Sequence, residues 1–300
     1  MPHLTYALVT PAKNEAEFIE QTILSVVAQD YKPIKWVIVD DGSSDGTADI
    51  VARFAQHHDF IVLLRRNGSD NRNFASKVQA FNSGLSALED THCELIGNLD
   101  ADIVLRPDYY ANIISAFEAD PNLGISGGTI HIVADAQYFK RDSTDDSVAG
   151  AIQLFRKGCF QQIGGYVPLE GGGIDAAAEI TARKCGWSVR KVPDNPAYEQ
   201  RRTGYHHGMT WRAAYKEGVQ YHKLGYGTLF YCLRSANRLG DHPLVVGSMC
   251  GLVGFVHAKL RGDQISLSPD IVSYLRTEQL RKIRQAFVGW WKKARQERVL

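Results

Sequence analysis

The sequence predicts an α/β fold, built around a mostly parallel sheet that helices cover on both faces. Apolar strand-like runs alternate with amphipathic helical patterns through the first part of the chain, and polar turn segments follow the strands. With 300 residues, of which 44% are hydrophobic and 22% charged, the chain can bury a sizeable core. The order of these elements is typical of βαβ units, whose strands are parallel.

The N-terminal segment shows both patterns. Residues 6–10 form a short apolar run that ends at Pro11, which is typical of a buried strand. Residues 15–29 carry apolar side chains at helical spacing, so a helix is expected there. Residues 36–39 repeat the strand pattern and lead into the turn-rich segment 40–47. One strand–helix–strand unit is therefore predicted here.

The alternation continues along the next 150 residues. Further helices are expected at about 47–57, 74–88, 108–119 and 175–185, and strands at 60–64, 95–99, 124–133, 153–156 and 188–192. Residues 135–149 are polar and poor in large aliphatic side chains, so we expect a mobile loop there, near the site. Ligands of such sheets bind beyond the carboxyl ends of strands, which directs attention to segments 11–15, 40–47, 65–77 and 100–102.

The character of the chain changes after about residue 200, so we expect two domains, 1–205 and 206–300. Residues 201–300 hold 17 Lys/Arg and 6 Asp/Glu, a balance of +11, and the whole chain balances at +1, which leaves −10 for residues 1–200. A basic helical appendage of this kind could meet an anionic membrane surface, an anionic acceptor or a nucleic acid.

Two segments of the C-terminal region favour membrane contact. Residues 243–256 are apolar or small throughout, but these 14 residues are fewer than the ~20 needed to span a bilayer. An interfacial or partly inserted hairpin, a helix packed on the protein and a true span all remain open. Residues 276–298 form a basic amphipathic pattern with Trp290 and Trp291, which suits a membrane interface or a solvated helix docked on the domain. We expect peripheral membrane contact through residues 234–298.

The cysteines and the N-terminus bear on the compartment. The five cysteines are scattered and without CxxC spacing, so we expect reduced thiols and not a disulfide framework or a zinc site. No signal-peptide pattern precedes the first strand-like run, because residues 1–3 lead directly into it. We therefore expect a cytoplasmic catalytic domain, at the inner face of the cell membrane.

Two carboxylates follow the fourth predicted strand. Asp100 and Asp102 are separated by one residue, in a bend where the strand ends. Carboxylate oxygens in this arrangement can converge on one hard cation, which suits Mg²⁺ or Mn²⁺. Such a cation could bridge a diphosphate and stabilise the charge of a leaving group. Triplets of this kind also arise by chance on solvated turns, and the position after a buried strand is what favours a metal site here.

Segment 40–47 also carries carboxylates at a strand end. A carboxylate there can accept a hydrogen bond from the imide N–H of a nucleotide base, and we assign this role to Asp41. The glycines of the segment permit tight turns, and Asp45 or Thr47 can cap the following helix. The alternative interpretation is a β-turn and helix cap without a ligand.

Three motifs occur in order and at fitting spacing: residues 11–15 (PAKNE), 37–47 (VIVDDGSSDGT) and 98–102 (NLDAD). Together they resemble family 2 of the glycosyltransferases, which use the GT-A fold, over roughly residues 5–205. The resemblance implies an inverting transferase that moves a sugar from a nucleotide diphosphate, most often UDP, to an acceptor hydroxyl. It implies nucleotide contacts from Pro11, Ala12, Lys13, Asn14, Glu15, Asp41, Lys77 and Asp100, and metal contacts from Asp100 and Asp102.

The candidate general base lies further along the chain. Many family members have a Gly-Gly-aromatic motif and then a Glu-Asp pair that opens a helix, whereas this chain has residues 164–166 (GGY) but no such pair. Asp175 resembles the single Asp that opens the helix in a subgroup, and a helix N-terminus favours a charged carboxylate. We therefore assign Asp175 as the base, with Glu170 and Glu179 as rivals and a plain helix cap as the alternative.

Two arginines follow the predicted sheet. In similar enzymes a basic patch at this point closes over the diphosphate, and Arg201 and Arg202 have the paired donors that bind phosphate oxygens. A surface charge pair is the alternative. With the basic C-terminal third, the resemblance implies a hexosyltransferase in cell-envelope or extracellular polysaccharide synthesis, with a saccharide or lipid-linked acceptor.

Other function classes have less support. A nucleotidyltransferase usually needs a glycine-rich loop after the first strand, and residues 11–15 contain no glycine. A non-catalytic nucleotide-sugar-binding partner at the membrane is supported only by the missing Glu-Asp pair. Nucleic-acid binding is disfavoured, because the C-terminal tryptophans form a pair on one amphipathic helix and are not interleaved along a groove.

Overall fold

The structure is a computed structural model that describes residues 3–68, 74–134, 137–140, 146–169, 171–201, 211–237 and 246–296, the backbone alone for 74–75, 133–134, 137–140 and 289–296. The chain divides into two compact units, Met1–Thr203 and Gly204–Leu300. Each unit is described by itself. The predicted site residues belong to the first of them.

The first half of the first unit is a parallel sheet. Its strands are β1 (Tyr6–Ala12), β2 (Lys35–Asp40), β3 (Ile61–Arg65) and β4 (Leu95–Asn98). β1 lies between β2 and β4, and β3 pairs with β2, all in parallel. The helices that connect them are α1 (Ile19–Val27), α2 (Thr47–Ala55) and α3 (Phe74–Ser86). The carboxyl ends of β1, β2 and β4 therefore meet at one edge, which is where the predicted motifs lie.

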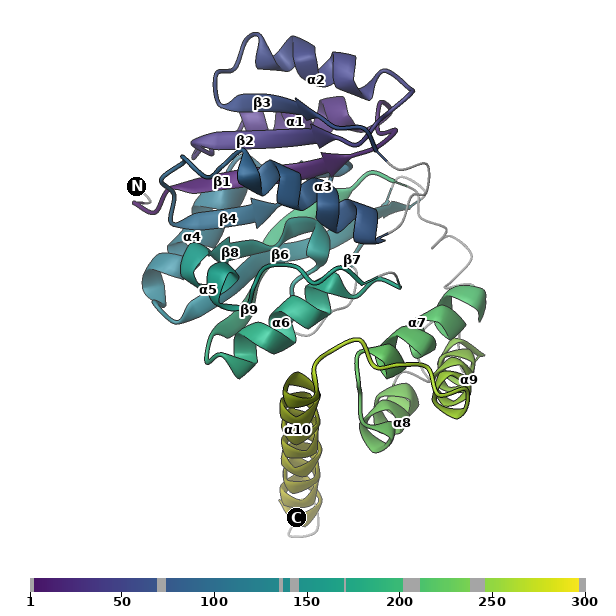
Figure 1. The fold of residues 1–300 in the computed structure, drawn as a ribbon. Helices are drawn as coiled ribbons and strands as arrows, with labels where there is room; N and C mark the ends of the chain where they lie inside the picture. Colours follow the sequence, from purple (N-terminus) through teal and green to yellow (C-terminus); the bar gives the residue numbers. More distant parts are fainter. Residues whose placement is uncertain are drawn as a thin grey trace. The chain divides into compact units, whose positions relative to one another are not determined.

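The second half of the unit adds mixed pairing. Its elements are β5 (Ile103–Leu105), α4 (Tyr109–Ala119), β6 (Leu123–Ala134), β7 (Gln137–Lys140), a 3₁₀ turn (Gly150–Ile152), β8 (Leu154–Arg156), α5 (Lys157–Gln162), α6 (Ile174–Lys184) and β9 (Ser188–Glu199). The strand order is β3-β2-β1-β4-β8-β6-β9-β5, with β7 on β6. β8 is antiparallel to β4 and β6, while β9 is parallel to β6. α3 and α6 lie in front of the sheet, and α1 and α4 behind it (Figure 1).

The predicted α/β fold, with a mostly parallel sheet flanked by helices, is confirmed. The strands that carry it are those with the strongest apolar runs: residues 6–9 of β1 and 36–39 of β2 are fully buried. β5, β7 and the short helix α5 were not predicted, because segments of three to six residues carry too little periodicity.

Two predicted elements need correction. The helix expected over 15–29 begins at Ile19, because Asn14 has a positive φ of 54°. The N–H groups of Glu15 and Ala16 form hydrogen bonds to the loop that follows β2 instead. The loop expected over 135–149 is wrong for residues 137–140, which form β7 against β6. Residues 135–136 and 141–145 lie outside the described residues.

The second unit is helical within its described residues. It contains α7 (Trp211–Lys223), α8 (Thr228–Asn237), α9 (Val246–Leu260) and α10 (Pro269–Gln296). α9 runs as one continuous helix, so the predicted hairpin is wrong for residues 246–256. Among the described helices, none combines the length and the apolar character that crossing a membrane requires.

Candidate active site

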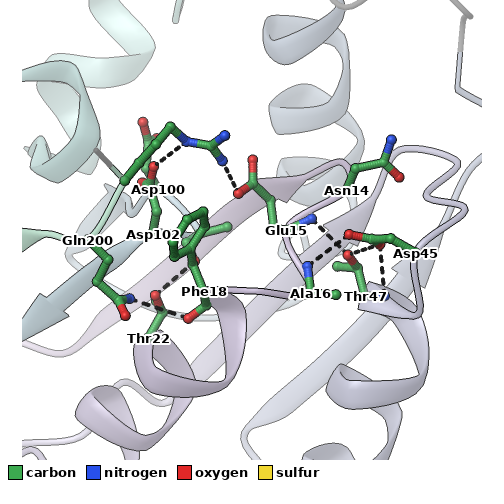
Figure 2. A network of polar contacts seen from close by, with 12 residues as sticks. Asn14, Glu15, Ala16, Phe18, Thr22, Asp45, Thr47, Asp100, Asp102 and Gln200 are labelled. Atoms are coloured by element: carbon green, nitrogen blue, oxygen red, sulfur yellow. Dashed lines mark hydrogen bonds and ion pairs between the residues drawn. The ribbon is translucent and has the colours of Figure 1, made fainter. Parts of the chain in front are cut away.

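The loops after β1 and β2 are locked together by hydrogen bonds. The carboxylate of Asp45 accepts the N–H of Ala16 at 3.0 Å and the Thr47 hydroxyl at 2.5 Å, and Thr47 Oγ1 accepts the N–H of Glu15 at 2.8 Å (Figure 2). Burial raises the pKa of Asp45, but these hydrogen bonds outweigh it and leave that pKa below its ordinary value. The predicted cap by Asp45 or Thr47 is wrong, because Gly46 (φ 88°) is the N-cap of α2 and no side chain caps that helix, although Asp45 accepts the N–H of Thr47 at 3.1 Å. The polar residues of both motifs thus build one rigid rim.

The five predicted residues of the first motif divide between strand and bend. Pro11 and Ala12 are the last residues of β1, where they pair with β2. Lys13 is half-buried and Asn14 exposed, while Glu15 is buried with 6% of its surface accessible. Only the bend therefore presents side chains at the carboxyl edge of the sheet.

Asp41 is buried at the end of β2. The Ser76 hydroxyl donates to its Oδ2 at 2.8 Å, and Arg66 Nε lies 3.2 Å from Oδ1 as an ion pair. Oδ1 nevertheless has no hydrogen-bond partner within the described part of the chain, and neither does Arg66 Nη1. The backbone at Gly68 packs so closely that an added Cβ would lie 1.9 Å from the Asp41 carbonyl oxygen. Within the described residues, Oδ1 thus has the charged Arg66 beside it but accepts no well-aligned hydrogen bond, so Asp41 is suited to accept a ligand N–H.

The first turn of α3 connects Asp41 to Asp100. Lys77 Nζ lies 2.7 and 2.8 Å from the two carboxylate oxygens of Asp100, and Asn98 Nδ2 donates to Oδ1 at 3.0 Å. Ser76, the neighbour of Lys77 in the chain, is the residue that contacts Asp41. The structure therefore brings the base-binding candidate and the first metal-binding candidate to the same rim.

Arg201 connects the second metal-binding candidate to the first motif. Its Nε donates to Asp102 Oδ2 at 3.0 Å, and its Nη2 forms an ion pair with Glu15. The guanidinium also lies over the ring of Phe18, 5.1 Å from its centroid. Figure 2 shows Glu15 and Asp102 facing each other at this point. Arg202, its predicted companion, lies outside the described residues.

The bend that carries the two aspartates is supported from beneath by α1. The Thr22 hydroxyl donates to the Ala101 carbonyl at 2.8 Å, and the Asp102 carbonyl accepts the N–H of Gln200 at 2.8 Å (Figure 2). Burial, and then the charge of Asp100, raise the pKa of Asp102, while Arg201 lowers it. The two carboxylates repel each other in a fixed bend, and a cation between them would relieve that repulsion.

Asp175 is connected to Asp100 by hydrogen bonds that pass through Gly150 and Asn98. It is in the first turn of α6, which follows Gly173 in the left-handed conformation (φ 79°). The N–H of Gly150 donates to Asp175 Oδ2 at 3.2 Å, and the Gly150 carbonyl accepts Asn98 Nδ2 at 2.6 Å. A Cβ at Gly150 would lie 3.0 Å from that of Asp175, so the approach needs glycine. Asn98 thereby couples the candidate base to the carboxylate of Asp100.

Glu179, a rival for the base, is enclosed one turn further along α6. Its Oε1 accepts the N–H of Val148 at 2.6 Å and a bond from Gln153 Nε2 at 3.3 Å, and Arg183 lies 3.8 Å from Oε2. Burial raises the pKa of Glu179 to about 8, against these lowering contacts. With its side chain only 4% exposed, Glu179 is enclosed and holds the segment before Gly150. Glu170, the other rival, lies outside the described residues.

The GGY motif supports this region from the interior. The Tyr166 hydroxyl donates to Gln153 Oε1 at 2.7 Å, and its ring packs edge-on against Phe81 and Phe155. Gly165, with a φ of 75°, makes the turn before it. Burial, followed by the charge of Asp175, holds the pKa of Tyr166 well above its ordinary value. The motif therefore acts as a buried support and has no direct place at the rim.

The residues present fit a divalent cation held jointly with a ligand. Asp100 and Asp102 supply two hard oxygen donors, and the described residues contain no group of three or more His, Cys, Asp or Glu side chains that could hold a metal. Mg²⁺ is commonly bound by one or two carboxylates together with phosphate oxygens and water. These two carboxylates are therefore suited to a divalent cation whose other ligands are diphosphate oxygens and water.

Sequence reasoning missed Arg66, Ser76 and Gly150. Arg66 and Ser76 lie within segment 65–77, which was expected to face the ligand because it follows β3. Their position in the sequence could therefore have identified them as candidates. Gly150 follows the polar segment 135–149 and carries no recognisable pattern. Its contribution comes from backbone groups, which a sequence does not display.

Comparison with known proteins shows a family match over the first unit. Residues 7–169, more than half of the chain, match Glycosyl transferase family 2. Poly-beta-1,6-N-acetyl-D-glucosamine synthase of Staphylococcus epidermidis is 30% identical over 171 residues, which cover 50% of this chain and 39% of that protein. The enzyme of the same name from Staphylococcus aureus (strain COL) is 28% identical over 170 residues and is covered to the same extent. The chain thus matches well under half the length of these relatives.

Solved structures share the fold at low identity. The mannosyltransferase PcManGT of Pyrobaculum calidifontis, in complex with GDP-Man and Mn²⁺, superposes with a TM-score of 0.56 and 17% identity over 97% of this chain and 85% of that chain. GalNAc-T7 with UDP, GalNAc and Mn²⁺ gives a TM-score of 0.56 and 15% identity over 89% and 59%. Residues 1–349 of S. aureus TarS give 0.53 and 12% over 87% and 73%. With a GT-A fold and a family match over most of its catalytic unit, the chain belongs to family 2 of the glycosyltransferases.

Proposed function

We propose that this chain catalyses the inverting transfer of a hexosyl group from a nucleotide diphosphate-sugar, with UDP as the expected nucleotide, to an acceptor hydroxyl. One observation carries the proposal: a continuous set of contacts joins three carboxylates at the carboxyl edge of the sheet, and a fourth lies beside them. Ser76 and Lys77 connect Asp41 to Asp100, and Asn98 with Gly150 connects Asp100 to Asp175. Asp102 follows in the same bend.

The nucleotide would lie across the ends of β1 and β2. Within the described residues, Asp41 Oδ1 is buried and accepts no hydrogen bond, which supports its role as acceptor for the imide N–H of the base. The bend at residues 13–15 would line the same pocket beside the backbone of Pro11 and Ala12, and Asp100 would face the ribose and the metal. Arg66 forms an ion pair with the enclosed Asp41 carboxylate at this end of the pocket.

The diphosphate would lie over Asp100 and Asp102. These two residues would hold Mg²⁺ or Mn²⁺, which stabilises the charge that develops on the leaving diphosphate. Lys77 and Arg201 neutralise the two carboxylates in the structure. When a cation takes over the carboxylates, these side chains are placed to turn to the phosphate oxygens, with Arg202 as their neighbour in sequence.

The acceptor hydroxyl would be activated by Asp175. Its carboxylate takes the hydroxyl proton as the oxygen attacks the anomeric carbon from the face opposite the diphosphate. The new carbon–oxygen bond forms while the bond to the diphosphate oxygen breaks, and the configuration inverts. Two backbone N–H groups hold the Asp175 carboxylate in place: Gly150 donates to Oδ2 at 3.2 Å and Ala176 donates to Oδ1 at 2.9 Å.

The setting is inferred from the relatives. The named synthases make a polysaccharide, which supports a role in cell-envelope or extracellular polysaccharide synthesis with a saccharide or lipid-linked acceptor. The basic second unit supports action at the cytoplasmic face of the membrane. A non-catalytic nucleotide-sugar-binding partner is the remaining alternative, since no Glu-Asp pair follows the GGY motif.

A thermal-shift panel of nucleoside diphosphates, each with and without Mn²⁺, tests the nucleotide and metal assignments together. We expect one nucleotide to raise the melting temperature only when Mn²⁺ is present. A folded sample that responds to no nucleotide in the presence of divalent cations would refute the proposal. Release of UDP from UDP-sugars with Mn²⁺ then separates an enzyme from a non-catalytic binding protein.

A further inference from the structure

One face of α9 presents large apolar side chains to solvent. The five residues recur at helical spacing along the full helix, so they form one stripe. Their exposed fractions are 56% for Val246, 59% for Met249, 59% for Val253, 39% for Val256 and 82% for Leu260. We call these five residues the α9 stripe. An ordinary water-facing helix has polar residues in this position, and a continuous apolar face marks a binding surface.

The other face of α9 is already occupied. Gly251, Gly254, Phe255 and Ala258 are buried. An added Cβ at Gly254 would lie 2.1 Å from the carbonyl oxygen of Tyr215 in α7, so the two helices touch through their backbones. The ring of Phe255 stacks on Tyr231 of α8 with centroids 4.6 Å apart. The helix therefore cannot turn the α9 stripe inward without losing this packing.

The unit that carries the α9 stripe is basic. Residues 204–300 contain 15 Lys/Arg and 6 Asp/Glu, and residues 242–260 contain no Asp or Glu. Lys259 and Arg261 are exposed at the C-terminal end of the helix, beside Leu260, and Arg261 forms an ion pair with Asp263. Lys259 Nζ bonds to Thr228 Oγ1 at 2.9 Å, which keeps it next to the exposed Leu229 at the start of α8. An apolar face with cations at its end matches the boundary between acyl chains and anionic headgroups.

We infer that the α9 stripe is a membrane-docking face, which inserts between the lipids of an anionic bilayer surface without crossing it. The positive charge of the unit favours an anionic bilayer over a second copy of this chain as the partner of the α9 stripe. Two copies of so basic a unit would repel each other where the stripes meet. α9 has 15 residues and lies flat in this arrangement, which agrees with its being too short to span. The inference deepens the proposed membrane setting and names the surface that makes the contact.

Vesicle co-sedimentation of the full chain tests the inference. The double variant Val253→Gln, Val256→Gln removes two exposed apolar side chains from the α9 stripe and keeps helix-compatible residues. We expect the parent chain to sediment with vesicles of phosphatidylcholine and phosphatidylglycerol, less so at high salt, and the variant to bind at least about tenfold more weakly. The double variant Leu24→Gln, Ile34→Gln changes two exposed apolar residues of the first unit and should bind like the parent.

Three results would overturn the inference: no sedimentation of the parent chain, equal binding by the stripe variant, or a dimer in light scattering that the stripe variant dissociates. Because the assay contains no nucleotide, metal or sugar, its failure would leave the sugar-transfer proposal standing. Conversely, a chain that binds vesicles but no nucleotide would refute the proposed function alone.

Discussion

The two units of the chain place their chemistry in opposite ways. In the first unit, carboxylates lie at one edge of the sheet and each forms an ion pair: Asp41 with Arg66, Asp100 with Lys77, and Asp102 with Arg201. In the second unit, glycines bring helix backbones together and large apolar side chains face outward. Buried charge indicates a site for a polar ligand, whereas exposed apolar surface indicates a partner that excludes water.

The largest expected effect concerns the proton acceptor of the first unit. Asp175→Asn should lower turnover by about 10²–10⁴-fold, because the amide cannot take the acceptor proton, while nucleotide affinity stays close to that of the parent. Steady-state kinetics and nucleotide titration measure the two quantities. Asp49→Asn, at a carboxylate whose side chain is 86% exposed, is the control and should change neither. Unchanged turnover in Asp175→Asn would remove that residue from the role.

The metal-binding candidates come next. Asp102→Asn should weaken Mn²⁺-dependent nucleotide binding by at least about tenfold, because one of two hard oxygen donors loses its charge. Binding measured without metal should change much less. If nucleotide affinity with Mn²⁺ is the same in Asp102→Asn and the parent, the metal contact of Asp102 is wrong.

The third prediction tests the close helix packing of the second unit. Gly254→Ala places a methyl group against the backbone of α7 and should destabilise that unit by about 1–3 kcal/mol, because the helices must separate. Gly158→Ala is the control, since nothing lies within 4 Å of its added Cβ. Chemical unfolding followed by circular dichroism provides the comparison, and equal midpoints for the two variants would contradict the close packing of α7 and α9.

The smallest expected effect is the pH dependence that Glu179 adds to the first unit. Its pKa is about 8 in the folded chain against an ordinary value of 4.5, so the folded state retains a proton that the unfolded state loses. The unfolding free energy should therefore fall as pH rises through that interval. Glu179→Gln removes this titration, so its stability relative to the parent should increase as pH rises through that interval, with little difference at the acidic end. Parallel pH profiles in urea unfolding would contradict this.

Much of the first unit could be predicted because its signals are local. The runs at residues 6–9 and 36–39 are apolar enough to identify buried strands, and the parallel order of those strands predicts that residues 41 and 100 meet at one edge. The expected contacts of Lys77 and Arg201 with the diphosphate came from the family resemblance and not from local patterns. Their ion pairs with Asp100 and Asp102 agree with a place at the rim, although only experiment assigns the roles.

The remaining features depend on tertiary contacts that leave no periodic trace. Gly150 acts through its N–H and carbonyl groups, and Glu179 is enclosed only because the segment around Val148 folds over α6. The apolar stretch at residues 243–256 was recognised, but its sequence does not tell which side of the helix faces out. That depends on α7 and α8, which cover the glycine face of α9.

The ion pairs of Lys77 and Arg201 have a consequence for how the site is filled. The two side chains are counter-ions tethered to the protein, so they compete with a free divalent ion at a high effective concentration. If Asp100 and Asp102 held the proposed cation, Lys77 and Arg201 would lose their carboxylate partners, and the phosphate oxygens of a bound diphosphate would replace them. We therefore expect metal and donor to load as one complex, and departure of the diphosphate to restore the resting pairs.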